Sequence, residues 1–415
     1  MAQENEKTSL EELIPDPDRR KDIINRLYKG DKLIGEDGIF TDMLQAMVNA
    51  ALEGEMDAHL SKEKSEGKSN RRNGKLSKKL KSNSGPLEVD SPRDRDGSFE
   101  PALVGKWKRT LNTGFDEAII HLYARGNSVE DIRHQLAELY GVEVSASAIS
   151  AVTARVMETA TEWQQRPLAQ CYPIVFLDAV HFKVRSEGKV TTKAVYTVYG
   201  VDVEGQRDVL GLYMGEAEGA HQWGLILEDL QKRGVEDVFF FCIDGLTGFK
   251  EVIEEVFPKS QVQRCIVHMI RSSTRFVSYK DLKSVNKDLR TVYTATNRQE
   301  AAMALETFGE KWNKKYPEIS KKWNENWEEL MTFMDWKKEI RRMIYTTNPV
   351  EALHRIMRRV TKSKGAWINE KALFKQLYLA LSQSEKSWKK TAYNWSKIKK
   401  ELYDHFGERY EQYIR

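Results

Sequence analysis

The chain has 415 residues, of which 40% are hydrophobic and 31% charged, and its formal net charge is +4. This composition supports a folded core and excludes wholesale disorder. No apolar stretch approaches the roughly 20 residues that a membrane helix needs, so an integral membrane protein is excluded. Three cysteines are too few for a disulfide framework, and the polar first 20 residues contain no apolar signal segment. We therefore expect a protein of the reducing cytoplasm.

The charge is unevenly distributed along the chain. Residues 1–60 hold 14 acidic and 7 basic side chains, residues 62–81 hold 2 acidic and 9 basic ones, and residues 355–400 hold 2 acidic and 13 basic ones. Two separate cationic blocks favour a polyanionic partner, of which nucleic acid is the commonest. The alternative is a charged, solvated surface that binds nothing.

The first two segments differ in composition. Residues 1–60 show helical periodicity and predict a small acidic helical region, which we interpret as a dimer contact. Residues 61–112 are rich in Gly, Ser and basic residues and predict a flexible loop or a thin β-ribbon. This segment either contacts DNA or is a plain linker. Its candidate phosphate contacts are Arg71, Arg72 and Lys75.

Residues 113–165 predict three short helices, and Ser128 with Asp131 matches the capping signal at a helix start. Two helices, a turn and a third helix that begins with small polar residues are typical of a DNA-binding helix-turn-helix. Other three-helix units of this kind bind nothing. The groove-facing candidates are Ser147, Ser150 and Thr153.

Residues 166–268 change to strand patterns. Three β-rich runs are followed by an amphipathic helix, a continuous apolar strand at DVFFFCI, a second helix and a fifth strand. The order β-β-β-α-β-α-β predicts a mixed α/β sheet with helices on both faces. Residues 269–343 break this alternation and predict an all-helical insertion rich in aromatics. Residues 344–415 predict basic helices, whose candidate DNA contacts are Arg355, Arg358, Arg359 and Lys362.

Two aspartates stand out within the strand region. Asp178 lies inside the first apolar strand, where an unpaired carboxylate is costly, and Asp244 follows the buried fourth strand directly. Ligands bind beyond the strand ends of open α/β sheets, and the first and fourth strands can be neighbours in this topology. Converging carboxylates of this kind would bind Mg²⁺, although each aspartate alone could be a simple strand-end turn former.

A third carboxylate is offered by Glu351. Asn348 is a good N-cap and Glu351 falls at the third helical position, so the pattern fits a capping box and a metal ligand equally well. Arg355 and Arg358 follow one and two turns later and would present guanidinium groups to a phosphate backbone. Cys265 and His268 have the spacing of half a zinc site, but without a second pair a packed, hydrogen-bonded structural role is favoured.

Across nearly the whole chain the sequence resembles the bacterial transposases of the mutator type. The resemblance rests on the order and spacing of several segments, which are EGEMDAHL, RRNGK, SPRDRDGSFEP, LYARGNSVEDI, ELYGVEVSASAIS, RPLAQCYPIVFLDAV, DLQKRGVEDVFFFCIDGLTGF, FPKSQVQRCIVHMIR and IYTTNPVEALHRIMRR.

The resemblance implies an RNase H-like catalytic core with a DDE site. Asp178, Asp244 and Glu351 match the family's metal-binding catalytic carboxylates, and Cys265 with His268 matches its C-x-x-H signature. It implies two Mg²⁺ ions, replaceable by Mn²⁺, and DNA substrates, namely terminal inverted repeats and target DNA. It also implies a homodimer when two ends are held together.

Two positions depart from the family pattern as the resemblance gives it, with His354 where an Asn is usual and Trp367 where a Phe is usual. These departures bear on local DNA contacts. A further hypothesis is that Trp312, Trp323 or Trp327 stacks on a displaced base, against the alternative of core aromatics. Two other functions remain open, a DNA-binding regulator with the α/β domain as a scaffold and a cellular RNase H-like nuclease or resolvase.

Overall fold

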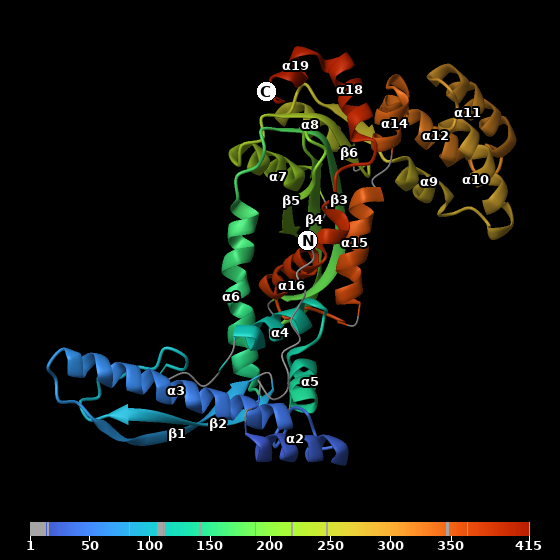
Figure 1. Ribbon diagram of the computed structural model, residues 1–415. Coiled ribbons are helices and arrows are strands. Elements are labelled where there is room, and N and C mark those ends of the chain that lie inside the picture. Colours follow the sequence, from blue (N-terminus) through green and yellow to red (C-terminus); the bar gives the residue numbers. More distant parts are fainter. Residues whose placement is uncertain are drawn as a thin grey trace. The chain divides into compact units, whose positions relative to one another are not determined.

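A computed structural model describes residues 14, 16–82, 84–105, 111, 113–140, 143–186, 188–216, 219–245, 248–345, 348–362 and 364–414 (Figure 1). The chain divides into two compact units, Met1–Arg155 and Val156–Arg415. Each unit has its own hydrophobic core.

The first unit begins with helices and an antiparallel ribbon. Helices α2 (Pro17–Lys29) and α3 (Ile39–Ser65) precede strands β1 (Arg72–Ser82) and β2 (Gly85–Asp94), which pair with each other. Helix α3 packs on β2, and apolar side chains from the helix and both strands share a small core, namely Val48, Leu52, Leu80, Leu87 and Val89. Of the two predictions for the basic segment, loop or ribbon, the structure shows the ribbon, because one face of it is apolar enough to cover α3.

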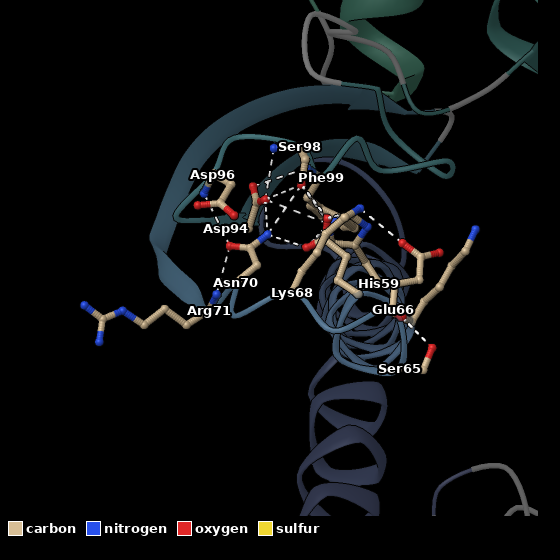
Figure 2. A network of polar contacts seen from close by, with 12 residues as sticks. His59, Ser65, Glu66, Lys68, Asn70, Arg71, Asp94, Asp96, Ser98 and Phe99 are labelled. Carbon is tan, nitrogen blue, oxygen red and sulfur yellow. Dashed lines mark hydrogen bonds and ion pairs between the residues drawn. The ribbon is translucent and has the colours of Figure 1, made fainter.

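A polar network joins the end of α3 to the open end of the ribbon (Figure 2). The Asp94 Oδ2 atom accepts hydrogen bonds from Asn70 Nδ2 at 2.7 Å, Ser98 Oγ at 2.7 Å and Ser98 N at 2.9 Å, and Oδ1 accepts from Phe99 N at 3.2 Å. The Asn70 amide also donates to Glu63 Oε2 at 2.5 Å. Each carboxylate therefore faces a fixed donor.

These donors set the charge state of Asp94. Burial of its carboxylate raises the pKa, but the hydrogen bonds from Asn70, Ser98 and Phe99 outweigh burial and hold the pKa of Asp94 well below its usual value. Because they favour the ionised form, the network is strongest when Asp94 is charged.

Helices α4 (Thr113–Ala124) and α5 (Val129–Tyr140) complete the first unit together with the start of α6 (Ala146–Gln165). The predicted capping box is confirmed, because Ser128 Oγ accepts from Asp131 N at 3.1 Å and Asp131 Oδ2 accepts from Ser128 N at 2.8 Å. A DNA-binding role for these helices stays a prediction.

The second unit is built on a mixed sheet (Figure 1). Among the residues that the structure describes, five strands pair in the order β5-β4-β3-β6-β7. Their bounds are β3 (Cys171–Ser186), β4 (Lys189–Val201), β5 (Arg207–Gly215), β6 (Asp237–Ile243) and β7 (Gln261–Arg264). β3, β4 and β5 form an antiparallel meander, and β6 and β7 run parallel to β3. The predicted order of strands and helices is confirmed.

Helices cover both faces of this sheet. On one face α7 (Ala220–Lys232) and α8 (Phe249–Val256) pack against Val175 and Leu177. Ile174 and Phe176 alternate with them along β3 and point into the larger core on the other face. Helices from α9 onward supply the rest of that larger core.

The remaining chain is helical. After β7 come α9 (Ile266–Thr274), α10 (Tyr279–Tyr293), α11 (Arg298–Trp312), α12 (Pro317–Glu325), α13 (Trp327–Met331), the short 3₁₀ helix η1 (Thr332–Asp335) and α14 (Lys338–Ile344). They are followed by α15 (Asn348–Thr361), α16 (Glu370–Gln383), α17 (Glu385–Trp388), α18 (Trp395–Phe406) and α19 (Glu408–Glu411). Helix α15 packs on β3 and β4, and its His354 lies beside Asp178 of β3 and Thr197 of β4.

Candidate metal and DNA site

The sheet register brings the two predicted aspartates together. β3 and β6 are parallel neighbours, and Leu177 pairs with Ile243. Asp178 follows Leu177 within β3, and Asp244 follows Ile243, the last residue of β6. Both carboxylates therefore lie where β6 ends. The prediction that the first and fourth strands of the core are neighbours is confirmed.

A histidine joins these aspartates. One ligand atom from each of Asp178, Asp244 and His268 lies within 4.8 Å of the others. Asp178 is 4% exposed, and its Oδ1 accepts from Ala179 N at 2.9 Å. Two carboxylates and an imidazole this close are a donor set that suits a divalent cation, with oxygen ligands for Mg²⁺ and a nitrogen that Mn²⁺ also accepts. The residues present therefore fit a metal ion.

Glu351 lies in the same cavity but outside that group of three. Its Oε1 is 3.0 Å from His268 Nε2, and both of its oxygens contact the Arg271 guanidinium, with Nη2 3.2 Å from Oε2. The cavity measures about 690 Å³ and is lined by Asp178, Ala179, His268, Arg271, Asn348, Glu351, His354, Arg355 and Arg358.

Charge governs the protonation of Glu351. Half-burial raises its pKa, but the ion pair with Arg271 and the proximity of His268 outweigh burial, so the pKa of Glu351 lies below its usual value. The same ion pair raises the pKa of the Arg271 guanidinium against the opposing effect of burial. Both shifts favour the charged forms of the Arg271–Glu351 pair.

His354 connects Asp178 to the interior of the sheet. It is 3% exposed, with Nε2 3.0 Å from Thr197 Oγ1 and Nδ1 3.4 Å from Asp178 Oδ2. Burial lowers the pKa of His354 to about 3, with a further lowering from the charge of Arg358. His354 is therefore a neutral imidazole beside a candidate metal ligand.

Trp367 is also buried, at 5% exposed, so neither departure from the family pattern sits on the surface to contact DNA.

The structure revises the expectation for Cys265 and His268. Cys265 is buried, and its backbone N–H donates to Ile243 O at 2.7 Å. His268 instead lies on the first turn of α9 and faces the carboxylates, with 21% of its side chain exposed. The C-x-x-H spacing alone could not show that Cys265 is buried while His268 faces the carboxylates, because it does not show where the helix begins.

The C-terminal cations take two positions. Arg355 and Arg358 line the cavity from α15, one and two turns after Glu351. Arg359 lies on the exposed side of the same helix, and Lys362 follows its end and is also exposed. These side chains are available to a phosphate backbone, although contact with DNA stays a prediction.

The ribbon cations differ in their surroundings. Arg71, Arg72 and Lys75 are all exposed. Arg72 pairs with Glu53 and with Asp57 at 2.6 Å, and Lys75 pairs with Glu53 at 2.7 Å. Two of the predicted phosphate contacts are thus partly neutralised by α3.

Of the three groove-facing candidates, Ser147 and Ser150 are exposed, whereas Thr153 is 2% exposed and its hydroxyl donates to Ser150 O at 3.1 Å. A three-residue spacing turns about 300° on a helix, so each step drifts by about 60°, and the third position reaches the buried side. This corrects the expectation for Thr153.

The base-stacking hypothesis for the insertion tryptophans is wrong for two of them. Trp323 is fully buried and its Nε1 donates to Ser273 Oγ at 3.0 Å. Trp312 is 9% exposed and donates to Asp288 Oδ2 at 2.8 Å. Trp327 is partly buried against the same core. These residues are core aromatics because apolar helices must bury their large side chains.

A second group with ligand spacing occurs in the first unit. Ligand atoms of His59, Glu63 and Asp94 also lie within 4.8 Å of one another (Figure 2). The carboxylate oxygens of Glu63 and Asp94 already accept hydrogen bonds from Asn70 and Ser98, so we interpret this group as a structural junction.

No helix among the described residues is both long and apolar enough to cross a membrane.

The fold and the acidic group define a mixed α/β protein with a candidate cation site at the strand ends. Residues 20–391 match the model of the family described as "Transposase, Mutator family". The chain belongs to this family, and the resemblance inferred from the sequence is confirmed.

The family assignment is supported by individual relatives. The chain is 41% identical over 395 residues to a probable transposase for insertion sequence element ISRM3-like from Sinorhizobium fredii, covering 94% of this chain and 98% of the relative. It is equally similar, over the same shares, to the transposase for insertion sequence element ISRM3 from Rhizobium meliloti. The transposase for IS905 from Lactococcus lactis is 30% identical over 345 residues, or 82% of this chain and 88% of the relative.

Proposed function

We propose that this chain cuts and joins DNA at the terminal inverted repeats of a mobile element, through an RNase H-like DDE site made of Asp178, Asp244 and Glu351. The observation that carries the proposal is the register of β3 and β6, which sets Asp178 and Asp244 side by side, with His268 between them and Glu351. Membership of a transposase family supports the reaction class.

Asp178, Asp244 and Glu351 would hold two Mg²⁺ ions, and His268 adjoins all three. Bound there, the ions supply activation of the attacking oxygen and neutralisation of charge on the leaving oxygen. The attacking group is water in the cleavage step and the freed 3′-hydroxyl in strand transfer, so no serine or tyrosine nucleophile is needed.

The chain's own groups prepare this site. Ala179 N and His354 fix the orientation of Asp178, because they contact its two oxygens separately. Arg355 and Arg358 project into the cavity, where they would hold the phosphates on either side of the scissile bond. The positions of these groups agree with a DNA backbone lying along the first two turns of α15.

DNA recognition is assigned to other elements. The three helices α4 to α6 would bind the terminal repeat as a helix-turn-helix, with Ser147 and Ser150 on the exposed side, and the ribbon would add phosphate contacts through Arg71. Cationic contacts of this kind make binding weaken steeply with salt. Two such chains would hold the two ends of the element as a homodimer in the bacterial cytoplasm.

The test is cleavage of a duplex that carries the element's terminal repeat. Asp178→Asn, Asp244→Asn and Glu351→Gln should each abolish Mg²⁺-dependent cleavage and joining while the repeat is still bound in a mobility-shift assay. Asp202→Asn is the matched control, because Asp202 only caps a turn by accepting from Glu204 N and Gln206 N. Retained cleavage in Asp178→Asn would refute the assignment.

The same assay separates the other functions. A DNA-binding regulator would bind the repeat without cutting it under any divalent ion. A cellular nuclease or resolvase would cut without preference for the terminal repeat and would not join strands.

A further inference from the structure

Arg271 makes an unusual contact with a proposed metal ligand. It lies in the last turn of α9 and donates to both oxygens of Glu351, in the planar fork geometry that suits a carboxylate. Its side chain is 59% exposed, whereas that of Glu351 is 23% exposed. The carboxylate is held in the cavity, and the guanidinium reaches it from the solvent side.

This contact competes with a cation for the same oxygens. Glu351 Oε1 also lies 3.0 Å from His268 Nε2, so both carboxylate oxygens already face protein donors. A divalent ion bound to those oxygens would leave fewer lone pairs for the N–H donors and would repel the nearby guanidinium. The ion pair with Arg271 and ion binding by Glu351 therefore oppose each other.

We propose that Arg271 is an exchangeable cation, which pairs with Glu351 until a divalent ion takes that carboxylate and then binds a phosphate of the DNA strand being cut. This inference rests on the proposed function, because it requires Glu351 to be a metal ligand. It assigns to Arg271 a role in binding the substrate backbone that the carboxylates do not provide.

The position of Arg271 suits both roles. His268 and Arg271 are three residues apart on α9, so they share one face of the helix and border the same cavity. Arg355 and Arg358 line that cavity from α15, so a phosphate held there would meet guanidinium groups from two helices. The Arg271 side chain is 59% exposed, so water can hydrate the guanidinium when it leaves Glu351. A planar guanidinium can then bind phosphate through two hydrogen bonds.

Competition has a thermodynamic signature. If the guanidinium and the ion compete for Glu351, the ion pair lowers the affinity of Glu351 for the ion by some factor. Removing Arg271 must then raise that affinity by the same factor. Losing a phosphate contact must at the same time slow cleavage. A merely structural role for Arg271 would weaken both properties, and a simple phosphate contact would leave ion affinity unchanged.

The experiment measures both properties in the full chain. Mn²⁺ binding without DNA is followed by isothermal titration calorimetry, and cleavage of a terminal-repeat duplex is followed at saturating Mn²⁺. In Arg271→Gln we expect Mn²⁺ to bind about 3- to 10-fold more tightly and cleavage to slow by about 10- to 100-fold. Arg271→Lys keeps the charge but loses the fork, so its ion affinity should stay near that of the unmodified chain while cleavage slows by less.

The control is Arg275→Gln. Arg275 follows α9, is exposed and stacks over Phe276 at 5.4 Å, outside the lining of the cavity, so neither property should change. Glu351→Gln separates the two proposals. If Glu351→Gln weakens Mn²⁺ binding but Arg271→Gln does not tighten it, the exchange is overturned and the site stands. If neither variant alters Mn²⁺ binding, the assignment of Glu351 as a ligand fails with it.

Discussion

Among the residues that the structure describes, two groups of acidic and histidine side chains have metal-ligand spacing, and they are built differently. In the first unit His59, Glu63 and Asp94 lie together, the Asn70 amide donates to both carboxylates, and Asp94 has fixed donors on both oxygens. In the second unit Asp178, Asp244 and His268 lie at the strand ends beside a cavity.

The difference lies in which neutral donors hold the carboxylates, because each group also has an exposed cation beside it, Lys68 next to Glu63 and Arg271 next to Glu351. Short, fixed hydrogen bonds from Asn70 and Ser98 hold the first group, so its negative charge is used to fasten α3 to the ribbon. The cations beside the second group are long and solvent-facing, as Arg271 shows with 59% exposure. Ligand spacing alone therefore does not distinguish a structural junction from a candidate cation site, whereas the fixed neutral donors on the first group and the cavity beside the second do.

The largest expected effect is the loss of cleavage in the second group. Asp244→Asn should reduce cleavage of a terminal-repeat duplex by about 1,000-fold or more, because it removes charge that stabilises a metal-bound transition state. Its melting temperature should stay the same or rise, since Asp178 loses a repelling neighbour. Both values can be measured by gel-based cleavage and thermal unfolding.

Glu63→Gln provides the contrast for Asp244→Asn. It alters the other acidic group and should leave the cleavage rate within about twofold, because that group belongs to a different unit with its own core. Equal losses of cleavage in the two variants would remove the distinction between the groups.

A smaller effect is expected at His354. His354→Leu should lower Mn²⁺ affinity and cleavage by about 10- to 100-fold, as is typical when a group that orients a metal ligand is lost. His354→Asn should recover most of both, because the asparagine amide keeps a polar N–H group close to Asp178 Oδ2, which His354 Nδ1 approaches to 3.4 Å. Calorimetry and cleavage rates check this pair. Equal loss in both variants would mean that packing volume, not the contact with Asp178, is what His354 contributes.

A substitution in the first group, which contains His59, Glu63 and Asp94, should instead lower the free energy of unfolding. Asp94→Asn should cost about 1–3 kcal/mol of unfolding free energy, because N–H donors of Ser98 and Phe99 would face an amide instead of a carboxylate. Urea unfolding followed by circular dichroism measures the change. Asp96→Asn is the control, since Asp96 lies in the same loop with an exposed side chain. A drop in Mn²⁺ affinity in Asp94→Asn would show that this group binds metal after all.

The pH dependence of that stability has a defined sign. The folded-state pKa of Asp94 lies below its unfolded value of 3.8, so the unfolded chain takes up the proton first as the pH falls. The contribution of Asp94 is complete above the unfolded pKa and is lost as the pH falls through the folded pKa. The stability of the unmodified chain should therefore fall more steeply below about pH 5 than that of Asp94→Asn.

Much of the second site could be predicted from local sequence. Asp178 interrupts an apolar strand and Asp244 ends a fully apolar one, and a continuous apolar run is typical of a buried parallel strand. Once β3 and β6 are neighbours in the register that pairs Leu177 with Ile243, the two aspartates meet. Glu351 was harder, because a capping box and a metal ligand put a glutamate at the same helical position.

The rest depends on contacts between distant segments. Arg271 and Glu351 are 80 residues apart, and nothing near either one indicates the pair. His268 belongs to the site only because α9 begins at Ile266 and turns its first residues toward the strand ends. In the first unit His59 and Glu63 have a visible helical spacing, but Asp94 joins them through the register of the ribbon, in which Arg72 pairs with Asp94.

The smallest expected effect concerns the ribbon. It tests whether a cation that is held in an ion pair within the protein contributes less to DNA binding. Arg71 is exposed, whereas Arg72 is held by Glu53 and Asp57. If the ribbon contacts phosphate, Arg71→Ala should reduce the slope of log affinity against log salt by about 1. Arg72→Ala should change it by less, because α3 already neutralises that guanidinium. Mobility-shift titrations of the terminal repeat at several salt concentrations measure both slopes. A larger change for Arg72 would show that DNA displaces Glu53 and Asp57, so that the ribbon exchanges partners as we infer for Arg271.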